Sequence, residues 1–86
     1  GTAIRMYPGN FFTVSASKKI SSIEIICSAN NAQGQVTASP GTVATADMTV
    51  TVSAINANST TITNAHTGTG ADSQLRIAKL TVNYAE

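Results

Sequence analysis

The sequence of 86 residues has few charged side chains, and this scarcity excludes several classes of partner. Only 10% of the residues are charged, against a usual share of about 25% in soluble domains. Five cations and four anions leave a net charge of +1, and among the cations only Lys18 and Lys19 are adjacent. Because neutralising several phosphates requires a clustered basic stripe, we expect no nucleic-acid partner.

Long apolar runs are also absent. The longest candidate, "IEIIC" at residues 23–27, is interrupted by Glu24, whereas a membrane-spanning helix needs about 20 apolar residues in succession. We therefore expect no membrane span.

Nucleophiles and bases of the kind used in catalysis are scarce. Cys27 is the single cysteine, so no disulfide can form within the chain. It shares a strand parity with Ile23 and Ile25, which predicts a small buried hydrophobe rather than a reactive thiol. His66 is the single histidine and lies near Asp72 in a glycine-containing loop. Such a loop does not hold a catalytic triad in position, so we expect an exposed loop histidine.

The carboxylates are equally few and widely spaced. Glycoside hydrolysis requires two of them across a cleft, and only a coincidence of folding would pair Glu24 with Asp47. One histidine, one cysteine and scattered acids do not make a zinc site, although a weak calcium site at Asp47 or Asp72 stays open. "GTGADS" at 68–73 imitates a phosphate-binding loop without a following helix, and predicts a turn. We expect no enzymatic activity, no catalytic residues, no metal site and no cofactor.

The residues that are abundant favour β-structure. Thr, Val and Ile alternate with polar residues at a period of two, and Gly, Asn and Ser separate these segments. The pattern predicts an all-β fold, a single antiparallel β-sandwich (jelly-roll or Ig-like) of seven to eight short strands within one domain, 1–86. The expected strands cover residues 3–7, 11–16, 20–28, 35–39, 48–55 and 60–64 and the C-terminal stretch 74–86, with 42–47 as a weak strand or an ordered loop.

Turn residues predict how these strands connect. Pro8-Gly9-Asn10 should join strands 3–7 and 11–16 into a hairpin. "SKK" at 17–19 and "NANS" at 56–59 should form polar turns. The predicted core consists of Ile4, Met6, Phe12, Val14, Ile20, Ile23, Ile25, Val36, Val50, Val52, Ile62, Leu80, Val82 and Tyr84.

The C-terminal segment "QLRIAKLTVNYAE" has apolar residues on both parities. We predict that Leu80, Val82 and Tyr84 face the core. A bulge or twist near Ile77 should then turn Leu75 and Ile77 inward as well.

One set of surface residues suggests a ligand site. Tyr7 and Phe11 flank the Pro8-Gly9 turn on the outer parity, and Arg5 lies two residues from Tyr7. Aromatic faces and hydrogen-bonding side chains are what a sugar requires, so Arg5, Tyr7 and Phe11 are the candidate ligand-binding residues, although the sequence has no Trp. The alternative is a cross-strand aromatic pair that stabilises the hairpin by about 0.2–1 kcal/mol.

Three segments, "IRMYPGNFFTVSA", "KKISSIEIICS" and "QLRIAKLTVNY", resemble a small β-domain that recurs, often C-terminally, in secreted and surface proteins of Bacteroides-type gut bacteria. The middle of the chain, 29–73, matches only loosely, and Leu80 stands where Ile is commoner. The resemblance implies a β-sandwich in an extracellular or cell-envelope setting, taken from a longer secreted protein, and it transfers no catalytic residues. The matching positions are Ile4, Arg5, Tyr7, Gly9, Asn10, Lys18, Ile20, Ile23, Ile25, Ser28, Gln74, Arg76, Ile77, Leu80, Val82 and Tyr84.

These observations favour a non-enzymatic extracellular β-sandwich module with a structural or adhesive role. A carbohydrate-binding module is the first alternative, and a subunit of a fibre or capsid-like assembly is the second, in which Thr-rich edge strands pair between chains. The expected partners are a glycan or neighbouring domains of the parent protein, and we expect a monomer in isolation.

Overall fold

Seven β-strands and two short 3-10 turns make up the computed structural model, which describes residues 4–29 and 32–85. No α-helix occurs in these ranges, so the all-β prediction is confirmed. The branched side chains of Thr, Val and Ile, stiff about their first torsion, suit the extended backbone. The strands are β1 (Ile4–Met6), β2 (Phe11–Cys27), β3 (Val36–Ser39), β4 (Thr42–Ala46), β5 (Thr49–Ser53), β6 (Ala57–Asn64) and β7 (Leu75–Tyr84); the 3-10 turns are η1 (Gln33–Gln35) and η2 (Ala71–Ser73).

Strand β2, 17 residues long, organises the whole sheet. Its first part, Phe11–Ser15, pairs with β6, and its last part pairs with β5 on one side and β7 on the other. The register with β6 shifts between Ser15 and Ile20, where the strand bends. The predicted turn at 17–19 is therefore wrong. The chain stays extended there because the Lys19 carbonyl still accepts a hydrogen bond from Ala85 N at 2.8 Å.

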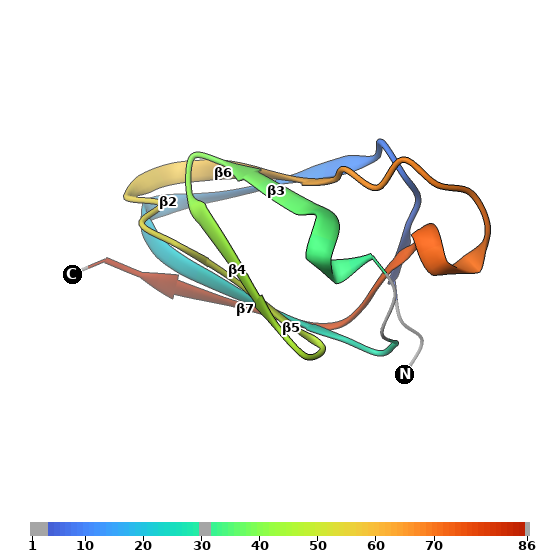
Figure 1. The fold of residues 1–86 in the computed structure, drawn as a ribbon. Helices are drawn as coiled ribbons and strands as arrows, with labels where there is room; N and C mark the ends of the chain where they lie inside the picture. The colour runs from blue at the N-terminus through green and yellow to red at the C-terminus, as the bar shows by residue number, and fades with distance from the viewer. Residues whose placement is uncertain (1–3, 30–31, 86) are drawn as a thin grey trace.

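The sheet is antiparallel throughout and curls into a half-barrel. β3, β6 and the first part of β2 form one side; β1, β7, the last part of β2, β5 and β4 form the other (Figure 1). The predicted β1–β2 hairpin is wrong, because β1 pairs with β7 instead. Gly9 N donates to Asn64 O at 2.8 Å, so the Tyr7–Asn10 turn crosses from one side to the other. The segment 56–59, predicted as a turn, contains the start of β6.

The core lies between the two sides of the half-barrel, and most of the predicted core residues occupy it. Ile4, Leu80 and Tyr84 were predicted to be buried, but they are 67%, 36% and 49% exposed. Their strands border the open side of the half-barrel, where no strand of the described residues covers them. The buried apolar residues are Met6, Ile20, Ile23, Ile25, Cys27, Ala32, Val36, Val50, Val52, Ile55, Ile62, Leu75 and Ile77; Phe12, Val14 and Val82 are partly buried against them.

Strand β7 contains the predicted bulge. Ile26 pairs with Lys79 and Cys27 with Ile77, so Ala78 is the extra residue. This insertion brings Leu75 and Ile77 to the inner face, where they are 0% and 6% exposed, as predicted. Leu80 also lies on the inner face, opposite Ile25, but beyond the reach of β1.

The radius of gyration is 12.2 Å, close to the value of about 12 Å expected for one compact domain of this length. Within the described ranges no helix is long and apolar enough to cross a membrane.

Gly41 gives a test of the packing between β4 and β5. Its φ is +140°, and a Cβ there would lie 2.6 Å from Val52 Cγ1. We expect Gly41→Ala to destabilise the fold by about 1–3 kcal/mol, since the added methyl group meets a buried side chain in a backbone conformation that favours glycine. Gly34→Ala is the matched control, because its Cβ would meet nothing within 4 Å. Urea denaturation with equal midpoints for both variants would contradict the prediction.

Candidate functional site

An apolar groove opens along the uncovered side of the half-barrel. It lies between β1 and β7 on one side and the first part of β2 on the other, with a cavity volume of about 560 Å³. Arg5 contributes the single charged residue among those that line it. The lining residues are Ile4, Arg5, Met6, Gly9, Asn10, Phe11, Phe12, Val14, Ile77 and Leu80.

The groove exists because three strands end their pairing here. β1 is three residues long and covers only Leu75–Ile77 of β7. Beyond Ile77, β7 pairs with β2 alone among the described strands, and Phe11–Ser15 of β2 pairs with β6 alone. Apolar side chains that would be covered in a closed barrel therefore reach solvent, above all Ile4 at 67% exposure. Exposed apolar patches of this kind mark interaction sites.

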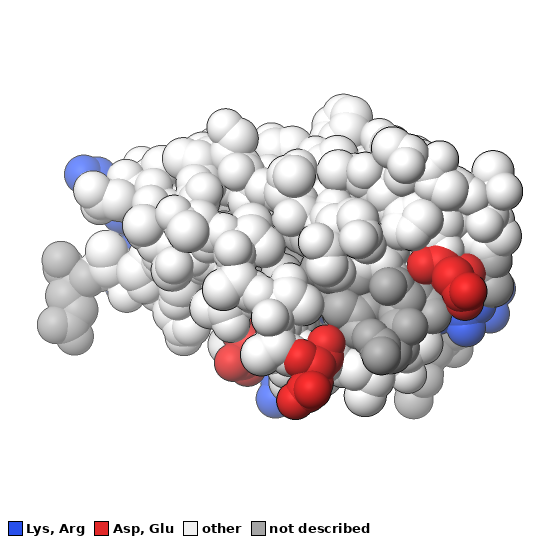
Figure 2. Space-filling view, in the orientation of Figure 1, with Lys and Arg blue, Asp and Glu red and all other residues white. Residues whose placement is uncertain are grey.

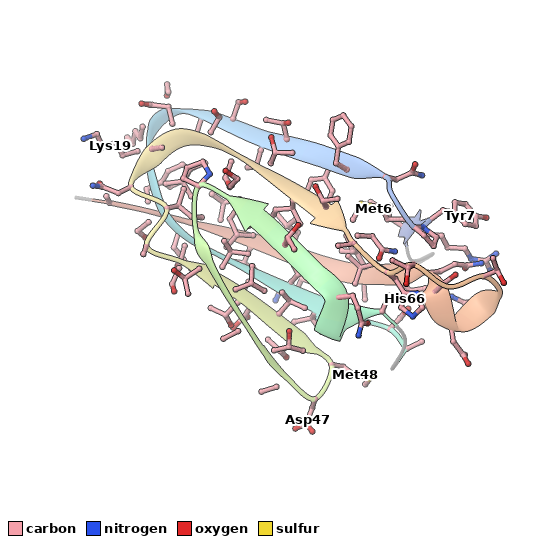
Figure 3. The ribbon with its side chains drawn as sticks, turned by 45° about the horizontal axis from the view of Figure 1, so that its top comes forward. Met6, Tyr7, Lys19, Asp47, Met48 and His66 are labelled. Carbon is pink, nitrogen blue, oxygen red and sulfur yellow. The ribbon has the colours of Figure 1, made fainter. Side chains whose placement is uncertain are left out.

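A second, shallower pocket of about 450 Å³ lies at the end of the molecule that carries Tyr7 and His66 (Figure 3). Tyr7 is half exposed, and it lines this pocket together with Gln74 and the loop 68–70. Two residues before Tyr7, Arg5 of β1 lies directly opposite Arg76 of β7. Two like charges placed opposite each other on adjacent strands repel, so an anion between them would be stabilising.

Two polar atoms beside this pocket lack partners. Gln74 Oε1 and Arg76 Nε are buried without a hydrogen bond in the described structure. Buried polar atoms are nearly always hydrogen-bonded, so each of these unpaired atoms indicates room for water or a ligand group. On the face shown in Figure 2 most atoms belong to uncharged residues, in keeping with the 10% of charged residues in the chain.

Asn64 holds the second pocket together. It is fully buried, and its Nδ2 donates to Met6 O and to Ser73 O, each at 2.8 Å. Its Oδ1 accepts from His66 N at 3.0 Å. This amide thus joins the end of β1, the loop after β6 and the η2 turn. The sequence places Asn64 at the end of a Thr-rich strand, and this pattern did not predict that its side chain would join three segments. The turn-forming residues after it are the one feature of the sequence that indicates a structural role there.

The structure divides the three predicted ligand-binding residues between the two sites. Arg5 and Phe11 line the apolar groove, whereas Tyr7 lines the second pocket. The alternative of a cross-strand aromatic pair is wrong, because Phe11 lies opposite Thr63 of β6 and Tyr7 belongs to the turn after β1. Leu80 lines the groove and Gln74 lines the second pocket, and neither was predicted as a ligand contact.

The remaining candidate groups have structural surroundings. His66 is half-buried rather than exposed, because its Nδ1 accepts a hydrogen bond from Gly68 N at 2.8 Å and closes a turn. Glu24 lies on β2 between Thr51 and Thr81, whereas Asp47 belongs to the β4–β5 turn. The described residues contain no group of three or more His, Cys, Asp or Glu placed to hold a metal ion.

Comparison with known proteins gives no match: no family model, no curated protein and no solved structure is similar to this chain.

Cys27 gives a prediction on pH. Burial raises the pKa of its thiol, because the thiolate would lose hydration in the core. The unfolded chain therefore releases this proton at lower pH than the folded chain. The contribution of Cys27 to stability is complete below the ordinary thiol pKa and is lost as the pH rises through the raised value. The urea midpoint should fall over this alkaline range more for the wild type than for Cys27→Ala; equal declines would contradict the prediction.

Asn64 gives a prediction on stability. Asn64→Ala removes hydrogen bonds to two backbone carbonyls and leaves those groups unpaired, so we expect a loss of about 1–3 kcal/mol in the free energy of unfolding. Asn58→Ala is the matched control. Asn58 is exposed and its Nδ2 donates to Ala16 O at 3.2 Å. Its replacement by alanine should therefore lower the free energy of unfolding by less than about 0.5 kcal/mol. Denaturant titration of the two variants decides, and a control as damaging as Asn64→Ala would refute the role assigned to Asn64.

Proposed function

We propose that this chain is a non-catalytic β-sandwich module with a structural or adhesive role, and that it contacts its partner through the apolar groove. The observation that carries the proposal is the uncovered inner face between β1 and β2, bordered by exposed Ile4, Phe11 and Leu80. A domain this small has little apolar surface to leave in water without a function.

Two further features support the finer parts of the proposal. β3 and β6 lie across the core from β7 and β5, which is the arrangement of two layers in a sandwich (Figure 1). The segments that resemble surface domains of gut bacteria form β1, β2 and β7, the strands around the groove. An extracellular or cell-envelope setting within a longer protein follows from that resemblance.

The adhesive role is testable with beads coated with the chain. We expect the beads to be retained under flow on a surface of immobilised unfolded polypeptide. The double variant Ile4→Ser with Leu80→Ser should reduce retention roughly tenfold, because it removes apolar contact area worth more than about 1.4 kcal/mol. Met48→Ser is the control. Met48 is 42% exposed but lies at the tip of the β4–β5 hairpin, away from the groove (Figure 3).

Equal retention of the double variant and the wild type would overturn the assignment of the groove. Circular dichroism of each variant should first show the β-signal of the wild type, since Ile4 and Leu80 are exposed and their replacement should leave the core intact.

A carbohydrate-binding role is the second candidate, favoured by the pocket beside Tyr7. A tyrosine ring, the Gln74 amide and Ser73 line this pocket and offer an apolar face with donors and acceptors around it. The two unpaired atoms, Gln74 Oε1 and Arg76 Nε, leave hydrogen bonds for a ligand to complete.

A glycan array that includes neutral and acidic sugars tests this second role. Tyr7→Ala should abolish any retention, whereas Phe11→Ala should preserve it, because Phe11 lies on the other site. Silence of the wild type across both classes of sugar would exclude the carbohydrate-binding role and would leave the groove proposal unaffected.

A further inference from the structure

The first part of β2 presents a free strand edge to the groove. In the described residues, Phe11–Ser15 pairs with β6 on one side only. The Asn10 carbonyl accepts from Asn64 N at 3.0 Å and therefore points toward β6. Backbone direction alternates along an antiparallel strand, so Phe12 and Val14 also pair toward β6. The N–H and C=O groups of Phe11, Thr13 and Ser15 then point into the space beside the groove.

The opposite border of the groove is also unpaired. β1 has β7 as its partner on one side only, and β7 beyond Ile77 has β2 alone. Among the described strands, the half-barrel therefore lacks pairing between the first part of β2 and the β1–β7 border. An uncovered strand edge is a template for pairing with another chain.

The floor of the groove matches one face of an extended chain. Met6, Phe12, Val14, Ile77 and Leu80 line it, and all five are apolar. A strand laid along the edge would point every second side chain at this floor and the others at solvent. The occupant should therefore carry apolar residues at alternate positions.

Charge specifies the ends of the occupant. Arg5 lies at one end of the groove, and no carboxylate is among the lining residues. Lys18 and Lys19 follow the free edge of β2 at the other end, and Figure 3 shows Lys19 at the opposite end of the molecule from Met6 and Tyr7. Arg5 is thus the one cation among the residues that line the groove, and Lys18 and Lys19 lie farther along β2, beyond that lining. An occupant with acidic residues at both ends is complementary to this arrangement.

We propose that the groove accepts an extended segment of another polypeptide, apolar at alternate positions and acidic at its ends. The segment adds as a strand to the Phe11–Ser15 edge and closes the half-barrel. This inference rests on the proposed groove function and names the class of partner. A small apolar molecule would fill the floor but leave the backbone groups of Phe11, Thr13 and Ser15 unpaired. A second copy of the chain would bring an edge strand of its own, such as β3, β4 or Phe11–Ser15, and is the alternative occupant that the tests below distinguish.

The first test uses a synthetic peptide of about seven residues, a typical strand length, in which valine and threonine alternate between glutamates at both ends. A matched peptide carries N-methyl groups on alternate backbone nitrogens, so it keeps the side chains but cannot pair with the edge. Calorimetric titration of the whole chain should show that the unmethylated peptide binds at least tenfold more tightly than the methylated one. The methylated peptide cannot form several of the backbone hydrogen bonds to the edge.

The second test changes the protein. Thr13→Pro removes one N–H from the free edge while leaving the groups that pair with β6, so it should weaken peptide binding by about tenfold or more. Thr13→Val is the control, because both variants lose the hydrogen bond between Thr13 Oγ1 and Thr61 Oγ1 at 3.0 Å, but only the proline loses the N–H. Replacing the glutamates of the peptide with lysines should lower its affinity for the wild-type chain. Added salt should reduce the difference in affinity between the glutamate and lysine peptides.

The outcomes separate the two proposals. Equal affinity for the methylated and unmethylated peptides would overturn strand addition but would keep the groove as an apolar docking site. Binding of neither peptide, together with a wild-type level of bead retention for the groove double variant, would overturn both. Concentration-dependent dimers in sedimentation velocity that the peptide does not displace would instead assign the edge to a second copy, against the proposal. Because the peptide comparison uses the unaltered chain, it decides even if Thr13→Pro fails to fold.

Discussion

The continuity of β2 is the constraint on which the rest of this structure depends. One strand of 17 residues belongs to both sides of the half-barrel, pairing first with β6 and then with β5 and β7. Because a bent strand joins the two sides, they can face each other and bury Ile23, Ile25 and Ile62 between them. The same bend leaves the early part of β2 with one neighbour only, so the core and the open groove have a common origin.

The two candidate sites differ in the kind of chemistry they offer. The groove supplies apolar area and unpaired backbone, which suit a polypeptide, whereas the pocket at Tyr7 supplies an aromatic ring and an amide, which suit a polar ligand. Arg5 lies on the short strand between them. Asn64 fixes the end of this strand, because its buried side-chain amide donates hydrogen bonds to both Met6 O and Ser73 O. The β1 end therefore depends on this polar network as well as on the apolar packing of buried Met6.

Much of the fold could be predicted from residue patterns, and the failures have physical causes. Period-two alternation located most of the strands, and the double-sided pattern of β7 predicted the bulge at Ala78, because an extra residue is the way to bring both parities inward. The hairpin between β1 and β2 and the turn at 17–19 were wrong, since turn-forming residues indicate a change of direction but not the strand that is met afterwards. Lys18 and Lys19 lie in a bend that long-range pairing keeps extended.

Alternation and composition are local properties, so they sufficed to predict an all-β fold with few charges and a core of branched apolar residues. Which apolar residues are covered depends on how the strands are arranged in space. Ile4 and Leu80 have the pattern of core residues and lie on the inner face, yet they are exposed because none of the strands in ranges 4–29 and 32–85 closes the half-barrel beside them. The arrangement of the strands also separates Tyr7 from Phe11, which are neighbours along the chain but line different sites. Both outcomes depend on strand order, which is set by contacts between residues far apart in sequence.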